Sequence, residues 1–316
     1  MTLANAHEYR SPNRRHDRHF FYKYVTAKVA KVVLTTRMLR WSSPILFNDP
    51  FDVTQELRLN FDEAKINAAL TDRMASLMED GDPSNSVKHP VIAFLLQAAR
   101  RATPEVRRTM ANQLRQAESL GIPTPGQIEA FAALKDMWKE MVPTFRVLCL
   151  SELNDVTPMW QHYSDGYKGV VLEFSAVDEL DSAFLVARPV QYQDTPPAIA
   201  DPNQWVSCML GQGGSTYRDL FTEYEYVKTN AWSYEKEWRI VSGARPGESG
   251  LFGDYGFHPH ELTGIYFGPK SSAEDRSDLL ALLGHGLEHV RAHEAFLDSQ
   301  QAKIAFRAIT RQQFVV

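Results

Sequence analysis

The sequence predicts an α+β fold built on a mixed, mainly antiparallel sheet. Apolar, β-prone segments lie toward both ends of the 316-residue chain, and helix-like segments fill residues 62–140. Several connections between the strand-like segments are too short for the crossover helix that a parallel βαβ unit needs. We therefore expect a single α+β domain over residues 19–316, with a helical insert at about 62–140.

The first expected strand covers residues 20–25, whose sequence FFYKYV is aromatic and β-prone. The polar, arginine-containing residues 1–18 before it are expected to form a flexible leader, with a nucleic-acid-binding arm as the alternative. A short helix is expected over 27–39. Asn48-Asp49-Pro50 predicts a rigid corner, because Asn and Asp side chains bond to the local backbone and Pro fixes φ.

The central block is expected to hold four helices, separated by breaks that contain Gly or Pro. They cover 62–80, 90–101, 104–120 and 124–141. Strands are then expected at 145–150, 167–174, 187–192, 237–242, 262–267 and 303–314, with helices at 158–164, 217–229 and 272–295.

Charge and composition exclude several classes of protein. The chain has 34 Lys and Arg against 39 Asp and Glu, a net charge of −5, so it is a poor non-specific binder of nucleic acid outside a local basic patch. Two cysteines cannot build a disulfide framework. No apolar run approaches the ~20 residues of a membrane span. We expect a soluble, cytoplasmic protein without a membrane partner.

Three segments are dense in side chains that can carry chemistry. They are Tyr22-Lys23-Tyr24, the stretch from Cys149-Leu150-Ser151-Glu152 to 159–166, and Trp232-Ser233-Tyr234-Glu235-Lys236-Glu237-Trp238-Arg239. Together with Phe47-Asn48-Asp49-Pro50-Phe51-Asp52, this ordered set resembles a bacterial family described as domain of unknown function 2971. That family implies no activity.

The same pieces also resemble, in their order, the ADP-ribosyltransferases of the arginine–serine–glutamate type. Those enzymes carry an aromatic–Arg pair on the first strand, a Ser on a middle strand and a Glu-x-Glu at a later strand. Here the matching residues are Tyr22-Lys23, Ser151 and Glu235-Lys236-Glu237. Lys23 departs from the usual Arg or His and loses bidentate phosphate binding, and the helical block is long for that superfamily.

The resemblance implies NAD as a substrate and Glu237 as the carboxylate that stabilises an oxocarbenium-like state. Glu235, expected on the same face of one strand as Glu237, would orient the acceptor. Lys23 would supply a cation near the pyrophosphate, and Ser151 would bond the ribose or hold Glu237. The other expected NAD-binding residues are Tyr22, Trp160, His162, Tyr163 and Tyr234, of which Trp160, Tyr163 or Tyr234 would stack on nicotinamide.

The acceptor stays open: protein, nucleic acid, a small molecule or water. Such enzymes are often deployed as bacterial toxins or in phage defence, which is the setting the resemblance suggests. A structural alternative places Glu235 and Glu237 on the exposed face of an edge strand, Trp160 and Tyr163 in the core, and His162 in a structural role or as a general base.

Two other classes of function remain. A metal-dependent hydrolase or nuclease would use Asp49, Asp52, His162, Asp165 and Glu237, although their spacing is not that of a tight ligand set. Within this class, the motif His285-Gly286-Leu287-Glu288-His289 reads H-x-x-E-H on an expected helix and would form a zinc site. A non-catalytic interaction module would instead bind a partner through residues 62–140.

Overall fold

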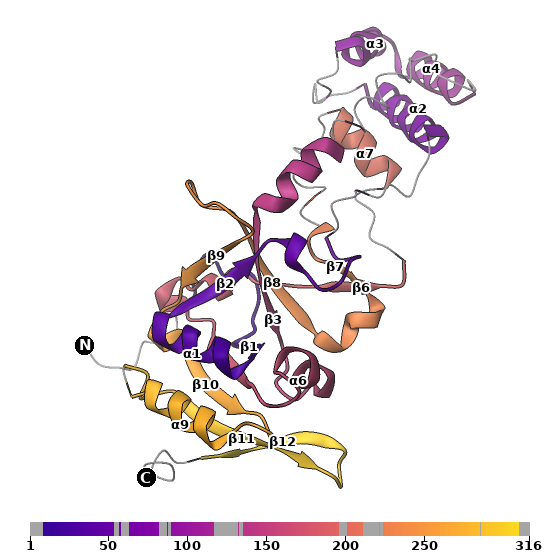
Figure 1. Ribbon diagram of the computed structural model, residues 1–316. Coiled ribbons are helices and arrows are strands. Elements are labelled where there is room, and N and C mark those ends of the chain that lie inside the picture. Colours follow the sequence, from indigo (N-terminus) through magenta and orange to yellow (C-terminus); the bar gives the residue numbers. More distant parts are fainter. Residues whose placement is uncertain are drawn as a thin grey trace. The chain divides into compact units, whose positions relative to one another are not determined.

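A computed structural model describes residues 9–53, 57, 63–81, 87, 90–116, 132, 135–195, 201–210, 221, 224–284 and 286–309. The chain divides into two compact units. The first comprises Met1–Asp52, Val142–Asp194 and Lys228–Val316, and the second comprises Val53–Met141 and Thr195–Val227. Figure 1 labels most of the helices and strands of both units.

The first unit is built on a large, mainly antiparallel sheet, as the sequence predicts. Its central strands are β1 (Phe20–Val25), β3 (Phe145–Ser151), β4 (Val170–Ser175) and β10 (Leu262–Phe267). The strand order is β12-β11-β10-β4-β1-β3-β2-β9, and β8 pairs with both β3 and β5. The pair β10–β11 is parallel, whereas the other described pairs of this sheet are antiparallel. The remaining strands are β2 (Met38–Ser42), β5 (Arg188–Pro189), β8 (Glu237–Gly243), β9 (Phe252–Gly256), β11 (Arg291–Asp298) and β12 (Lys303–Ala308).

Side chains alternate between the two faces of the sheet along each strand, and the central strands β3 and β4 carry buried residues on both faces. Phe21, Leu148 and Leu172 pack on one face with apolar residues of α1 (Ala27–Thr36) and α9 (Ala273–Leu282) (Figure 1). Tyr24, Val171 and Tyr266 pack on the other face with Met159 and Trp160 of α6 (Thr157–Tyr163). The candidate site lies on this second face.

The described part of the predicted leader contacts the sheet unit through polar side chains. Arg14 Nη2 lies 2.6 Å from Asp178 Oδ2, and the Ser11 hydroxyl donates to Asp181 Oδ1 at 2.7 Å. The Arg14 hydrogen bond holds the pKa of Asp178 down at about 2. Residues 9–18 thereby reach the turn around the 3-10 helix η4 (Asp178–Leu180).

The second unit is helical over most of its described residues. Its helices are α2 (Glu63–Asp80), α3 (Pro90–Arg100), α4 (Pro104–Gln116), residues 135–141 and α7 (Pro202–Met209). The helical segments expected at 62–80, 90–101 and 104–120 match α2, α3 and α4, whereas 117–131 lie outside the described residues. Helix α2 packs against both α4 and α7.

Three expected boundaries are wrong. The helix expected over 27–39 ends at Thr36, because Arg37 takes a left-handed conformation and Met38 opens strand β2. The helix expected over 272–295 ends at Leu282, and residues from Arg291 onward form β11. The expected helix 217–229 gives way to a short strand, β7 (Val227–Thr229), which pairs with β6 (Gln191–Gln193).

None of the described helices combines the length and the apolar character that crossing a membrane requires.

Candidate functional site

The site forms where strands β1 and β3 separate. The two strands share a single bridge pair, Tyr22 opposite Ser151, whereas β1 pairs along its whole length with β4. Ser151 is in turn paired with Glu237 on β8, so that Tyr22, Ser151 and Glu237 lie in register on three neighbouring strands. Beyond the bridge pair, Lys23 Nζ donates to the carbonyl of Cys149 at 2.7 Å, a bond that a backbone N–H would supply in a closed ladder.

A cavity of about 440 Å³ opens at this point. Its lining includes most of the residues that the sequence predicts for the site: Tyr22, Lys23, Ser151, His162, Tyr163, Glu235 and Glu237. The corner around Asn48, with Phe47 and Asp52, contributes a further part of the wall. A cavity of this size with convergent polar groups is typical of small-molecule sites.

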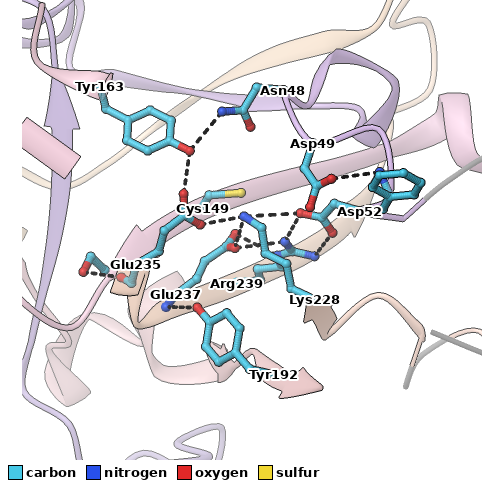
Figure 2. A network of polar contacts seen from close by, with 12 residues as sticks. Asn48, Asp49, Asp52, Cys149, Tyr163, Tyr192, Lys228, Glu235, Glu237 and Arg239 are labelled. Atoms are coloured by element: carbon cyan, nitrogen blue, oxygen red, sulfur yellow. Dashed lines mark hydrogen bonds and ion pairs between the residues drawn. The ribbon is translucent and has the colours of Figure 1, made fainter. Parts of the chain in front are cut away.

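Figure 2 shows a buried ion cluster, whose side chains all line the cavity except that of Arg239. It consists of five side chains, each 5% exposed or less: Asp52, Lys228, Glu235, Glu237 and Arg239. Lys228 Nζ lies 2.6 Å from Glu235 Oε2, 3.1 Å from Glu237 Oε2 and 3.5 Å from Asp52 Oδ2. Three carboxylates therefore share two cations.

Arg239 holds two of these carboxylates. Its Nε donates to Glu237 Oε1 at 2.8 Å and its Nη2 to Glu237 Oε2 at 2.9 Å, which is the bidentate geometry of a strong Arg–carboxylate pair. Its Nη1 also donates to Asp52 Oδ1 at 2.9 Å. Asp52 follows the corner predicted from Asn48-Asp49-Pro50, where the Asp49 carboxylate accepts from the Phe51 N–H at 2.9 Å.

The two glutamates are in different electrostatic states. Burial acts to raise the pKa of Glu237, but the charges of Arg239 and Lys228 outweigh it and bring the pKa to about 2. Burial likewise raises the pKa of Glu235, and here the opposing charge of Lys228 does not outweigh it, so the pKa stays above its usual value. Glu235 is therefore the carboxyl of this pair that takes up a proton more readily.

Glu235 does not lie on a strand, which corrects the expectation of one shared strand face. It ends the 3-10 helix η6 (Asn230–Glu235), and Lys236 then adopts φ 46° before Glu237 opens β8. This left-handed residue turns the chain, and the two carboxylates meet because both bind Lys228. The edge-strand alternative is also wrong, since both glutamates are buried and β8 lies between β3 and β5.

Tyr163 and Ser151 fix Glu235 from two sides. The Tyr163 hydroxyl donates to Glu235 Oε1 at 2.6 Å and accepts from Asn48 Nδ2 at 3.1 Å. The Ser151 hydroxyl donates to the backbone carbonyl of Glu235 at 2.7 Å. Ser151 thus holds the chain that carries Glu235, whereas the sequence suggested that it holds Glu237.

Two predicted NAD-binding aromatics lie elsewhere. Trp160 is fully buried, donates its indole N–H to the Asn154 carbonyl at 2.8 Å and packs edge-on against Tyr24. Tyr234 packs beside the same apolar cluster and near the Trp232 ring. Neither is part of the cavity lining. These positions match the core alternative for Trp160 and give Tyr234 no stacking surface in the cavity.

The residues proposed for a metal site do not assemble. Asp165 is exposed and pairs with Lys168 at 3.7 Å, while Asp52 and Glu237 are bound to Arg239. Within the described ranges, no group of three or more His, Cys, Asp or Glu residues is arranged to hold a metal ion. His289 points its Nε2 at the carbonyls of Pro259 and Leu262, on a segment that is not helical, and His285 lies outside the described residues.

Sequence reasoning missed Lys228 and did not anticipate that Asp52 and Arg239 pair. Lys228 carries no local motif: the sequence predicts a helix over 217–229, which includes it, and its partners are acidic residues from three other segments. One signal was available in the sequence: the motif segments contain more acidic than basic residues. If these segments meet in a buried site, a cation from elsewhere in the chain must compensate the excess negative charge.

Comparison with known proteins supports one of the two resemblances. Residues 159–240 match the family model described as protein of unknown function (DUF2971). This match confirms the predicted family for that segment. The DUF2971 segment includes His162, Tyr163, Lys228, Glu235 and Glu237, whereas Tyr22 and Ser151 precede it. No curated protein and no solved structure matches the chain.

Proposed function

We propose that this chain is an NAD-using enzyme of the ADP-ribosyltransferase type, either a transferase or an NAD glycohydrolase. The observation that carries the proposal is the register of Tyr22, Ser151 and Glu237 on β1, β3 and β8, all three of which line the cavity. The resemblance implies the same order of strands and residue types. On this proposal, the antiparallel sheet is of the ADP-ribosyltransferase-like kind.

Lys23 supports the phosphate-binding part of the proposal. Its ammonium group lines the cavity, and its hydrogen bond is to the neutral carbonyl of Cys149. Among the residues that the structure describes, no carboxylate lies within ion-pair distance of Lys23. An ammonium group without a carboxylate partner in a cavity wall attracts an anionic group such as a phosphate.

We assign the carboxylate that contacts the ribose to Glu235 in place of Glu237. Both oxygens of Glu237 are occupied by Arg239, which already compensates its charge. Glu235 binds a neutral phenol at Oε1 and Lys228 at Oε2, and it lines the cavity. A carboxylate bound to a neutral donor retains more capacity to stabilise a developing positive charge.

The proposed reaction breaks the bond between the ribose C1′ and the nicotinamide nitrogen. The bonding electron pair leaves with nicotinamide, which becomes neutral, and positive charge develops on the ribose near Glu235. The acceptor or a water molecule then forms a bond to C1′ and gives its proton to the Glu235 carboxylate. Glu235 can accept that proton because burial raises its pKa.

Nicotinamide release from NAD tests the proposal. The purified wild-type protein should release nicotinamide with or without EDTA, and Glu235→Gln should lower the rate by about 10²-fold or more with little change in thermal stability. Glu261→Gln is the matched control, because Glu261 is also a buried glutamate but lies at the 3-10 helix η7 (Pro259–Glu261), outside the cavity lining.

Two outcomes would change the assignment. If Glu237→Gln abolished release and kept full stability while Glu235→Gln stayed active, Glu237 would be the carboxylate that acts on the ribose. The absence of release and of NAD binding in the wild-type protein, with a cell lysate as source of acceptors, would overturn the proposed activity.

A further inference from the structure

Lys228 occupies the centre of the ion cluster, although no sequence motif marks it. It lies on β7, is 4% exposed, and its Nζ also lies 4.9 Å from the centre of the Trp232 ring. Its three carboxylate partners come from three different segments: Asp52 from the Asn48 corner, Glu235 from η6 and Glu237 from β8.

The contacts of Glu235 show why this position matters. Within the described residues, its carboxylate accepts hydrogen bonds from Lys228 and from Tyr163. Of these two donors, only Lys228 is charged. Lys228 also bonds Glu237, so one ammonium group separates two carboxylates that would otherwise repel each other.

We propose that Lys228 is a positioning residue, which keeps the Glu235 carboxylate ionised and fixed at the wall of the cavity. As far as catalysis is concerned, this inference rests on the proposed function, but the electrostatic role does not. The charged and titratable groups that face Lys228 are Asp52, Glu235, Glu237 and Arg239, with the phenols of Tyr163, Tyr192 and Tyr234 next to them. Arg239 is engaged with Asp52 and Glu237.

The direction of the effect follows from these charges. Burial favours the protonated form of Glu235 and raises its pKa, whereas the Lys228 ammonium favours the ionised form. Replacing Lys228 by a neutral side chain of similar length removes the effect of the ammonium group and leaves the effect of burial. Glu235 should then hold its proton at a higher pH than in the wild-type protein.

The experiment is an infrared titration of the buried carboxyl groups in wild-type protein and in Lys228→Met. The Glu235 band is identified by its loss in Glu235→Gln. We expect its titration midpoint to rise by about one to two pH units in Lys228→Met. Lys228→Arg keeps the positive charge and should return the midpoint toward the wild-type value. Lys23→Met removes a cavity lysine that does not touch Glu235 and should leave the midpoint unchanged.

An unchanged midpoint in Lys228→Met would overturn the proposal and make Lys228 a structural residue. If Lys228→Met does not fold, it is combined with Glu237→Gln, which removes one charge of each sign. Because loss of the Glu237 charge by itself lowers the Glu235 midpoint, the double variant is compared with Glu237→Gln alone, and its midpoint is expected to be the higher of the two. Where nicotinamide release is observed, its pH profile should move by the same amount as the midpoint. A protein without release, but with the shifted midpoint, would contradict the proposed function and support the role of Lys228.

Discussion

Arg239 on β8 pairs with Asp52, which precedes it by 187 positions in the chain, through an Nη1–Oδ1 hydrogen bond of 2.9 Å. Both side chains are almost fully buried. The pair fixes the Asn48 corner to the strand that carries Glu237, and so connects two walls of the cavity.

Removing the guanidinium of Arg239 should be strongly destabilising. Arg239→Met leaves Asp52 and Glu237 buried without their main counter-charge, and we expect a loss of about 3–5 kcal/mol in the free energy of unfolding, measured with urea. Arg40→Met is the control: Arg40 makes a similar two-bonded pair with Asp254, but both side chains are at least 40% exposed. That change should cost about 1 kcal/mol or less. Equal losses in the two variants would contradict a special role for the buried pair.

Acid should destabilise the protein in part through Glu237. Its pKa is about 2 in the folded protein against an ordinary value of 4.5, so the folded state binds this proton less tightly than the unfolded chain. The resulting stability is present above about pH 4.5 and is lost as the pH falls toward 2, a change of about 3 kcal/mol. Urea unfolding from pH 2 to 7 should therefore show a smaller acid-dependent loss in Glu237→Gln than in the wild-type protein.

Glu235→Gln provides the opposite control for this titration. The pKa of Glu235 is raised by burial, so its stabilising contribution is greatest at low pH and falls as the pH rises above about 4.5. The stability differences of the two variants from wild type should thus change with pH in opposite directions. If the stability differences of both variants changed with pH in the same direction, Glu235 and Glu237 would not have pKa values shifted in opposite directions.

Trp160 should matter for stability and not for ligand binding. Trp160→Phe removes buried apolar volume and leaves the Asn154 carbonyl without its indole donor, at an expected cost of about 2 kcal/mol in unfolding free energy. NAD affinity, measured by calorimetry, should stay within about a factor of two of wild type below the unfolding transition. A large loss of affinity with unchanged stability would return Trp160 to the binding site.

The sheet and the helical block could be predicted because their signals are local. The aromatic β-prone run at 20–25 and the Gly and Pro breaks of the central block are visible in short windows of sequence. Seven of the nine predicted site residues line one cavity, and Trp160 and Tyr234 do not; the seven are Tyr22, Lys23, Ser151, His162, Tyr163, Glu235 and Glu237. What the sequence lacks is the pairing of distant charges. Asp52, Lys228 and Arg239 meet only through tertiary structure.

The errors have local physical causes. Lys236 is not a glycine or asparagine, so nothing in the sequence announces the left-handed turn that takes Glu235 off the strand. Trp160 lies in a segment dense in functional side chains, but its position on α6 directs the ring into the apolar cluster on that face of the sheet. The aromatic content of a motif does not reveal which ring faces a cavity and which faces the core.

Two of the four points at which the chain passes between the two units coincide with the ion cluster. The first segment of the first unit ends at Asp52, and its last segment begins at Lys228. Both residues belong to the first unit, so two charges of the cluster stand directly beside the points where the chain enters the second unit at Val53 and leaves it at Val227. An insertion or deletion within the second unit that leaves Asp52 and Lys228 in place therefore keeps one carboxylate and one ammonium group of the cluster in the chain.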